Sequence, residues 1–151
     1  MIVRAEGRAM AEPVLTYRGA VYPWHCDHMG HMNVMWYVGK FDEATWNLFS
    51  TLGLTPDYLR SASRGMAAVE QHIVYQREVF AGDTVSVHSE LLEVREKVIR
   101  FRHAMTNASG ETTAVTTLTA VHLDTAHRRS CPMPAEVLAA ARELLTSAGE
   151  D

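Results

Sequence analysis

The chain has 151 residues, 47% of them hydrophobic and 21% charged, which fits one globular domain with a single hydrophobic core. The formal net charge is -4, so no broad basic surface favours nucleic acid as a partner. Two cysteines, Cys26 and Cys131, make no disulfide framework and favour a reducing, cytoplasmic location, and no hydrophobic run is long enough to span a membrane.

The first element expected is a strand. Residues 1–13 lack a hydrophobic signal-peptide core, and we expect them to form a flexible leader to a single domain of residues 14–151. Residues 14–24 are rich in strand-forming residues, and Pro23 predicts that the strand ends there or lies at a sheet edge. The next segment, HCDHMGHM at 25–32, breaks the strand pattern.

A long helix follows this segment. Asn33 and Gly53 are typical of a helix start and a helix end. We expect one hydrophobic face formed by Val34, Val38, Phe41, Leu48 and Leu52, widened by Met35, Trp36, Trp46 and Phe49. The expected polar stripe is narrow and contains Lys40, Glu43, Asn47 and Ser50. A helix this hydrophobic should be mostly buried.

The remaining pattern is mainly strand. In residues 66–76 we expect one side to carry Ala67, Val69, Gln71, Ile73 and Tyr75. Turn residues then separate strands at 85–91, 99–105 and 112–124, and a short helix is expected at 135–147. Such grouping predicts an α+β fold, in which a curved antiparallel sheet of about five strands wraps around one long buried helix. Its open sheet edge favours dimerisation.

Two segments carry a family resemblance. Asp27-His-Met-Gly30-His31-Met-Asn33, followed on the helix by Trp36-Tyr37 and Phe-Asp-Glu43-Ala, resembles the hot-dog-fold acyl-CoA thioesterases of the 4-hydroxybenzoyl-CoA thioesterase type. The stretch from Tyr75 to Gly82-Asp83 is similar to that family's strand-to-turn signature. This resemblance covers about residues 15–125. It implies a hot-dog fold, hydrolysis of an acyl-CoA thioester to free acid and CoA, no cofactor besides the CoA of the substrate, and a homodimer or homotetramer.

The resemblance also implies catalytic roles. A helix N-terminus offers unpaired N–H groups, which stabilise the oxyanion that forms when a thioester carbonyl is attacked. The resemblance assigns this donor role to the N–H of Val34, and it makes Asp27 the nucleophile or the general base. Gly30 shapes the loop, and His31 orients the loop or lines the pocket. Glu43 is a further candidate, because a related hot-dog class uses a helix carboxylate.

Substrate-binding residues are expected at two places. Near the helix start they are Asn33, which can also cap the helix, and the pocket-wall residues Trp36 and Tyr37. Arg95 and Lys97 match basic positions that hold the CoA phosphates in the family. The active site of that family lies at a dimer interface, so two further residues, Glu70 and His72, are candidates to face a partner's pocket.

Three other interpretations compete. His25, His28 and His31 could bind a metal, but Gly30 indicates a loop and no spaced Cys pairs or HExxH pattern accompany them, so we expect no metal. Asp27 and His31 could serve a hot-dog hydratase or dehydratase, although the Gly-Asp-x-Asn-Pro and His-Phe-Pro elements of those enzymes are absent. The domain could also bind acyl-CoA without catalysis.

Overall fold

The computed structural model describes residues 12–145, so most of the expected leader and the end of the expected helix 135–147 lie outside the described residues. The elements in chain order are β1 (Val14–Ala20), the short 3-10 helix η1 (Pro23–His25), α1 (Val34–Leu52), α2 (Pro56–Ser61), β2 (Arg64–Tyr75), β3 (Thr84–Val94), β4 (Val98–Asn107), β5 (Thr112–Asp124), β6 (Arg129–Ser130) and α3 (Ala135–Glu143). The short elements η1, α2 and β6 were not expected from the sequence, and the strand predicted within residues 14–24 ends at Ala20.

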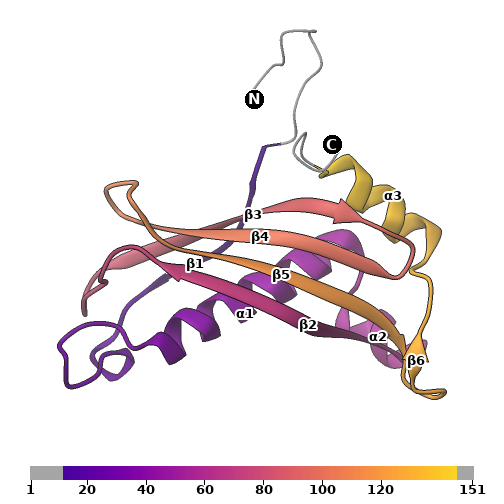
Figure 1. Cartoon of the computed structure of the whole chain (residues 1–151), viewed down its shortest axis with the longest axis horizontal. Coiled ribbons are helices and arrows are strands. Elements are labelled where there is room, and N and C mark those ends of the chain that lie inside the picture. Colours follow the sequence, from indigo (N-terminus) through magenta and orange to yellow (C-terminus); the bar gives the residue numbers. More distant parts are fainter. Residues whose placement is uncertain (1–11, 146–151) are drawn as a thin grey trace, which may run out of the picture.

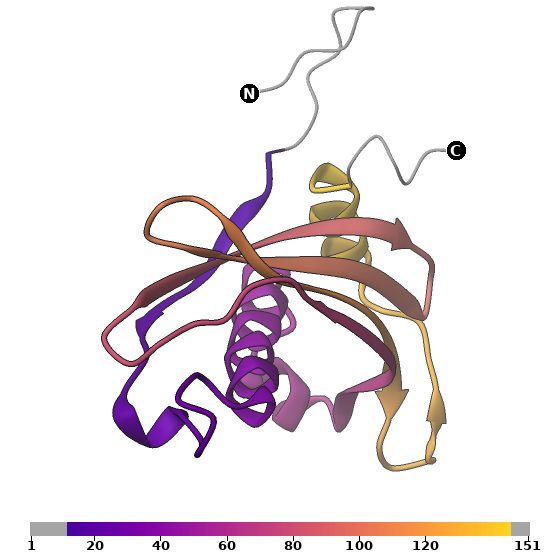
Figure 2. The ribbon, with the colours of Figure 1, turned by 60° about the vertical axis from the view of Figure 1, so that its left-hand side comes forward.

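The strands form one antiparallel sheet in the order β1-β3-β4-β5-β2, and β6 pairs with β5. The sheet curls around α1, which lies in its hollow (Figures 1 and 2). The expected curved sheet wrapped around one long helix is therefore confirmed. None of the helices within residues 12–145 has the length and hydrophobicity that crossing a membrane requires.

Local sequence sets both ends of α1. The Asn33 side chain accepts a hydrogen bond from the N–H of Met35 at 2.9 Å, which caps the first turn. Gly53 has a left-handed backbone with φ 96°, and its N–H bonds the carbonyls of Phe49 and Ser50. Both predicted ends of the helix are confirmed.

The face that α1 buries differs from the expected hydrophobic face. Phe41, Leu48 and Leu52 are buried as expected, whereas Val34 is 55% exposed and Val38 is 39% exposed. The prediction was wrong for these two residues, and also for Met35 and Trp46, which are exposed, because helical spacing identifies hydrophobic positions without showing where the covering sheet stops. Tyr37, which lies between Val34 and Val38 in the chain, is buried, so this part of the helix is covered on one side and open on another.

The predicted position of Lys40 on the exposed polar stripe was also wrong. This residue is only 2% exposed. Its ammonium donates hydrogen bonds to the hydroxyl of Tyr17 at 2.9 Å and to the carbonyl of Ala20 at 3.3 Å. These two acceptors belong to β1, which covers this side of α1. The contacts across the chain, which the sequence pattern does not show, explain why this charge is buried.

The predicted alternation in β2 is interrupted by a β-bulge. Ala68 pairs with Ala120 but Glu70 pairs with Thr119, so Val69 is the extra residue and is 63% exposed. The side chains of the strand therefore change faces at this point. The prediction that one side carries alternate residues from 67 to 75 was wrong for Ala67 and Val69.

A buried polar chain links α1 to the sheet through His103, which is 0% exposed. The Nδ1 atom of His103 lies 2.6 Å from the hydroxyl of Ser89, and its Nε2 atom lies 2.8 Å from the hydroxyl of Thr45. A further hydrogen bond of 2.7 Å joins Ser89 to Thr16 on β1. Burial lowers the pKa of His103 to about 3, so the ring is neutral in the folded protein.

We expect this histidine to make folding sensitive to acid. The imidazole takes up a proton near pH 6.5 in the unfolded chain but only near pH 3 when folded, so its contribution is complete above pH 6.5 and is lost as the pH falls. Between pH 6.5 and pH 5 the free energy of unfolding should fall by about 2 kcal/mol from this group. Urea unfolding of His103→Asn should show a lower stability at pH 7 and a flatter acid dependence.

The control for this prediction is His88→Gln, which changes an exposed histidine on β3. That variant should retain the acid dependence of the wild type. Equal slopes for the His103 variant and the wild type between pH 7 and pH 5 would contradict the assignment.

Candidate active site

The loop between η1 and α1 holds Asp27 in a tight turn. Gly30 has φ 88°, a conformation that glycine adopts readily, and its N–H bonds the carbonyl of Asp27 at 3.0 Å. The Oδ1 atom of Asp27 accepts the N–H of Met29, and its Oδ2 atom accepts the side-chain amide of Asn33, each at 2.8 Å. These two hydrogen bonds, that from Asn33 first, lower the pKa of Asp27. The carboxylate is therefore ionised at neutral pH.

Asn33 connects this carboxylate to the start of α1. Its Oδ1 atom caps the N–H of Met35 while its Nδ2 atom donates to Asp27. The N–H of Val34 is the first of the helix, and no acceptor for it occurs among residues 12–145. One side chain thus holds the carboxylate of Asp27 and caps the turn whose first N–H, that of Val34, has no acceptor among the described residues.

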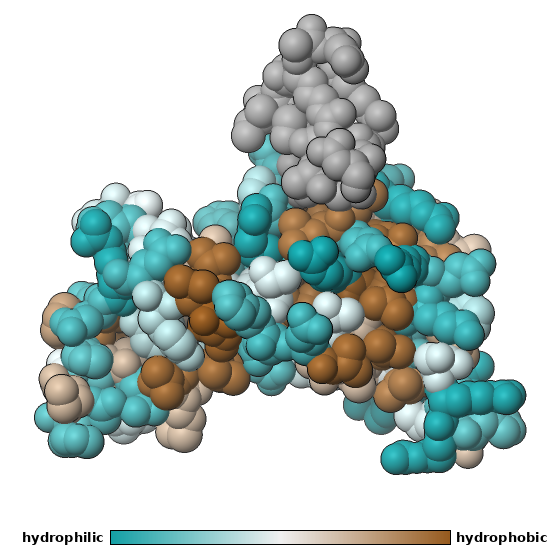
Figure 3. All heavy atoms as spheres, viewed as in Figure 1, coloured by the Kyte–Doolittle hydropathy of each residue, from teal (hydrophilic) through white to brown (hydrophobic). Residues whose placement is uncertain are grey.

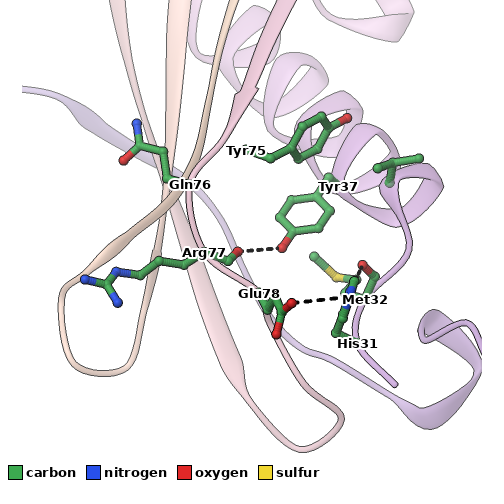
Figure 4. Close-up of a pocket in the computed structure, with 8 residues that line it drawn as sticks. His31, Met32, Tyr37, Tyr75, Gln76, Arg77 and Glu78 are labelled. Atoms are coloured by element: carbon green, nitrogen blue, oxygen red, sulfur yellow. Dashed lines mark hydrogen bonds and ion pairs between the residues drawn. The ribbon is translucent and has the colours of Figure 1, made fainter. Parts of the chain in front are cut away.

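A cavity of about 250 Å³ opens at this end of α1. We call it the helix-tip cavity, and its lining residues are His31, Met32, Val34, Tyr37, Tyr75, Gln76, Arg77 and Glu78. Figure 4 shows that they come from the loop, from the first turns of α1 and from the end of β2 with the segment that follows it. Asp27 is not part of this wall, but its carboxylate is hydrogen-bonded to Asn33, the residue before Val34, which is part of it.

Two tyrosines form the aromatic part of the cavity. The rings of Tyr37 and Tyr75 are 5.2 Å apart and nearly perpendicular, at 84°. The Tyr37 hydroxyl donates to the backbone carbonyl of Arg77 at 3.0 Å, and burial raises the pKa of Tyr37 to about 12, so this hydroxyl remains protonated. Tyr75 is 45% exposed and lines the same cavity.

The charged side chains at the cavity point in different directions. The Nε2 atom of His31 lies 3.6 Å from a carboxylate oxygen of Glu78. The Arg77 side chain points away from the two tyrosines and pairs with Glu111 at 2.9 Å (Figure 4). An acidic side chain therefore accompanies the aromatic rings, while the neighbouring guanidinium is turned outwards.

Other predicted site residues lie elsewhere. Trp36 and Glu43 line a separate groove between β1 and α1. Arg95 and Lys97 are exposed at the β3–β4 hairpin, at the opposite end of the sheet from the start of α1 (Figure 1), and Arg95 pairs with Glu93 at 2.6 Å. Within one subunit the structure does not bring these two basic residues to Asp27.

Two more predicted residues, Glu70 and His72, are exposed on β2, which is an edge strand. The three histidines of the loop have separate surroundings. His25 accepts the N–H of Tyr22 and packs on Trp36, while His31 faces Glu78. Over the described part of the chain, no three His, Cys, Asp or Glu side chains are grouped as a metal site would need.

Sequence reasoning did not identify Glu78 or Lys40 as site residues. Glu78 follows a strand whose Tyr75 matched a family signature, and this nearby match was the available signal for it. Lys40 gave no local signal, since its burial depends on β1. Both residues acquire their surroundings from elements distant in the sequence.

Known proteins share this sequence pattern and fold. A family model described as the thioesterase-like superfamily matches residues 21–141. The L-carnitine dehydrogenase/betainyl-CoA thioesterase of Agrobacterium fabrum is 33% identical over 135 residues, which are 89% of this chain and 28% of that protein. This chain thus spans less than a third of that relative.

A second relative is closer in length. The betainyl-CoA thioesterase of Pseudomonas aeruginosa is 29% identical over 131 residues, which are 86% of this chain and 82% of that protein. A Staphylococcus aureus protein whose structure was solved in complex with CoA superposes with a TM-score of 0.83 at 19% identity, covering 93% of this chain and 90% of that one. At this identity the superposition shows a shared fold.

Proposed function

Because this chain belongs to the thioesterase-like superfamily, we propose that it hydrolyses an acyl-CoA thioester to a free acid and CoA. One observation carries the proposal: Asn33 holds the ionised Asp27 beside the unpaired N–H of Val34 at the start of α1. Relatives named betainyl-CoA thioesterases, at 33% and 29% identity, support the reaction class.

In this mechanism the thioester carbonyl oxygen accepts the N–H of Val34, which stabilises the negative charge of the tetrahedral intermediate. Asp27 acts at the carbonyl carbon by one of two routes. As a general base it takes a proton from water, and the hydroxide formed adds to the carbon. As a nucleophile its oxygen forms the new bond directly, giving a mixed anhydride that water then hydrolyses. In either route the C–S bond breaks and CoA leaves as a thiolate that takes up a proton.

We propose that the acyl group carries a trimethylammonium cation, as the betainyl group does. Quaternary ammonium groups bind to the faces of aromatic rings, and a nearby carboxylate adds charge attraction. The perpendicular rings of Tyr37 and Tyr75, with the carboxylate of Glu78, provide both in the helix-tip cavity. Arg77, which would repel the cation, is turned towards Glu111.

A matched pair of substrates tests this acyl group. Betainyl-CoA and 3,3-dimethylbutanoyl-CoA have the same shape, but only the first is charged. In a thiol-release assay we expect kcat/KM to be about tenfold or more higher for betainyl-CoA, a difference of about 1.4 kcal/mol that lies within the range of cation–aromatic interactions. Glu78→Gln should reduce this ratio, because it removes the charge and keeps the shape.

The control is Glu136→Gln on α3, an exposed site away from the cavity. It should leave the ratio unchanged. Equal kcat/KM values for the two esters would reject the trimethylammonium substrate and keep the thioesterase proposal. Failure to hydrolyse any CoA ester, in a panel extended to aryl and medium-chain acyl groups, would reject the thioesterase proposal.

We also propose that the chain forms a homodimer through β2. Among the described residues, 12–145, this strand pairs only with β5, so its other edge is open there. Val69 and Val74 on β2 are 63% and 45% exposed, and Met35 and Trp46, on one side of α1, are 62% and 41% exposed. Hydrophobic residues gather in patches across the face shown in Figure 3. An open strand edge beside exposed hydrophobic side chains is typical of a surface that a second copy covers.

Sedimentation equilibrium tests the dimer. The wild-type chain should sediment with twice its monomer mass, and Val69→Lys should shift it towards monomer, because a charge on the open edge disfavours strand pairing. Glu136→Lys, which places the same charge on α3, should remain dimeric. A monomeric wild type at micromolar concentration would contradict the proposal.

A further inference from the structure

A second hollow lies on the other side of α1 from the helix-tip cavity. It runs between β1, η1 and the first turns of α1 and has a volume of about 720 Å³. We call it the β1–α1 groove, and the residues that matter here are Arg18, Tyr22, Trp24, Trp36, Lys40 and Glu43. Its size lies within the range of ligand pockets, and the mechanism proposed above assigns it no role.

One wall of the groove is a stack of aromatic rings. Tyr22 and Trp24 lie parallel, with ring centres 4.6 Å apart and an interplanar angle of 2°. Yet Tyr22 is 49% exposed and Trp24 is 66% exposed. Behind them His25 packs on Trp36 with ring centres 4.1 Å apart. A flat aromatic surface open to solvent suits a planar ring that continues the stack.

The floor of the groove carries a buried cation. Lys40 is 2% exposed, and its ammonium contacts two neutral oxygens, those of the Tyr17 hydroxyl and the Ala20 carbonyl. Three donors are available on an ammonium, and within residues 12–145 Lys40 forms no ion pair with a carboxylate. A buried cation without a counter-charge is unfavourable, so an anion in the groove would stabilise it.

The rim of the groove adds one charge of each sign. Arg18 on β1 is exposed and can meet a second anionic oxygen, since guanidinium binds phosphate well. Glu43 on α1 is exposed and can accept hydrogen bonds from an amino group. A ligand that fits all of these groups has a planar ring, an exocyclic amine and a phosphate.

We infer that the β1–α1 groove binds an adenine nucleotide, with the base on Trp24 and Tyr22 and a phosphate on Lys40 and Arg18. The amino group of the base faces Glu43. The nucleotide is either the 3′-phosphorylated ADP portion of a CoA substrate or a free adenine nucleotide. Only the first of these sources rests on the proposed thioesterase function. If the nucleotide belongs to CoA, this inference places a phosphate on Lys40 and Arg18, whereas the sequence predicted Arg95 and Lys97 for the CoA phosphates.

Tryptophan fluorescence gives a direct test that needs no turnover. Two of the three tryptophans, Trp24 and Trp36, line the groove, and Trp46 does not. Adenosine 3′,5′-bisphosphate, excited at a wavelength that adenine does not absorb, should quench the emission saturably. Trp24→Ala changes an exposed residue and should weaken binding, measured by calorimetry, about tenfold or more. Lys40→Met should also weaken binding of the bisphosphate, and adenosine, which has no phosphate, should bind the wild-type protein more weakly than the bisphosphate does.

The matched control is Trp46→Phe, which should keep the quenching and the binding constant of the wild type. Inhibition kinetics then identify the source. If the bisphosphate competes with acyl-CoA, and Trp24→Ala raises KM for acyl-CoA but not for an acyl-N-acetylcysteamine, the groove holds the nucleotide of CoA. If the bisphosphate binds without competing, the ligand is a free nucleotide. Absence of saturable binding, or equal binding by Trp24→Ala and wild type, overturns the inference whether or not the protein hydrolyses thioesters.

Discussion

Replacing Asp27 by Asn is expected to lower kcat/KM for an acyl-CoA ester by about 100-fold or more, the usual contribution of a positioned general base. Asparagine can still accept the N–H of Met29 through its oxygen, but it lacks the charge needed to attack carbon or to take a proton from water. Its amide also meets the amide donor of Asn33, where the carboxylate accepted a hydrogen bond at 2.8 Å. Activity should fall while the thermal midpoint and the circular dichroism spectrum change little, because Asp27 lies in a loop.

Two further variants make this result specific. Asp42→Asn removes a carboxylate from the exposed side of α1 and should keep wild-type kcat/KM. Glu43→Gln tests the rival helix carboxylate. An active Asp27 variant together with an inactive Glu43 variant would transfer the catalytic role to Glu43 and would remove Asp27 from the mechanism.

Replacing Val34 by Pro should lower kcat by about 100-fold to 1,000-fold, the effect typical of losing one oxyanion donor. Proline removes the N–H and leaves the rest of the helix start in place. The first helical position favours proline, and the preceding Asn33 already has the extended conformation that proline requires, with φ -73° and ψ 149°. The chain itself contains this arrangement at α2, where Pro56 follows Thr55 with φ -79° and ψ 159°.

Val34→Ala is the matched control, because it shortens the same side chain and keeps the N–H. It should retain kcat within a few-fold, although KM can change because Val34 lines the helix-tip cavity. Helix content should be the same in both variants by circular dichroism. A proline variant with the wild-type kcat would show that the oxyanion is stabilised elsewhere.

The two expected results depend on one short stretch of sequence. Asn33 serves both groups, since its Oδ1 atom caps α1 and its Nδ2 atom orients Asp27. The spacing of six residues between Asp27 and Asn33, with Gly30 at the turn, is what lets one amide reach both. This part of the candidate site is local, and for that reason the sequence pattern could predict it.

The sequence by itself determined the elements whose ends depend on neighbouring residues. Asn33 and Gly53 predicted the ends of α1, and residues 112–124 match β5 at both ends. In these cases the deciding hydrogen bonds and backbone angles lie within a few residues of each other, so local composition specifies them. The grouping of strands after one hydrophobic helix likewise predicted the curved sheet.

Tertiary structure decided which surfaces those elements share. Val34 and Lys40 exchanged their expected environments, because β1 covers one side of α1 while the sheet leaves the start of the helix open. The bulge at Val69 changed the faces of β2, and Glu78 reached His31 from a segment 47 residues away in the chain. Periodicity shows that a residue is hydrophobic or polar at a given spacing, but burial depends on what packs against it. Burial is decided by contacts between distant segments. Such contacts bring Glu78 to the helix-tip cavity and bury Lys40 in the β1–α1 groove.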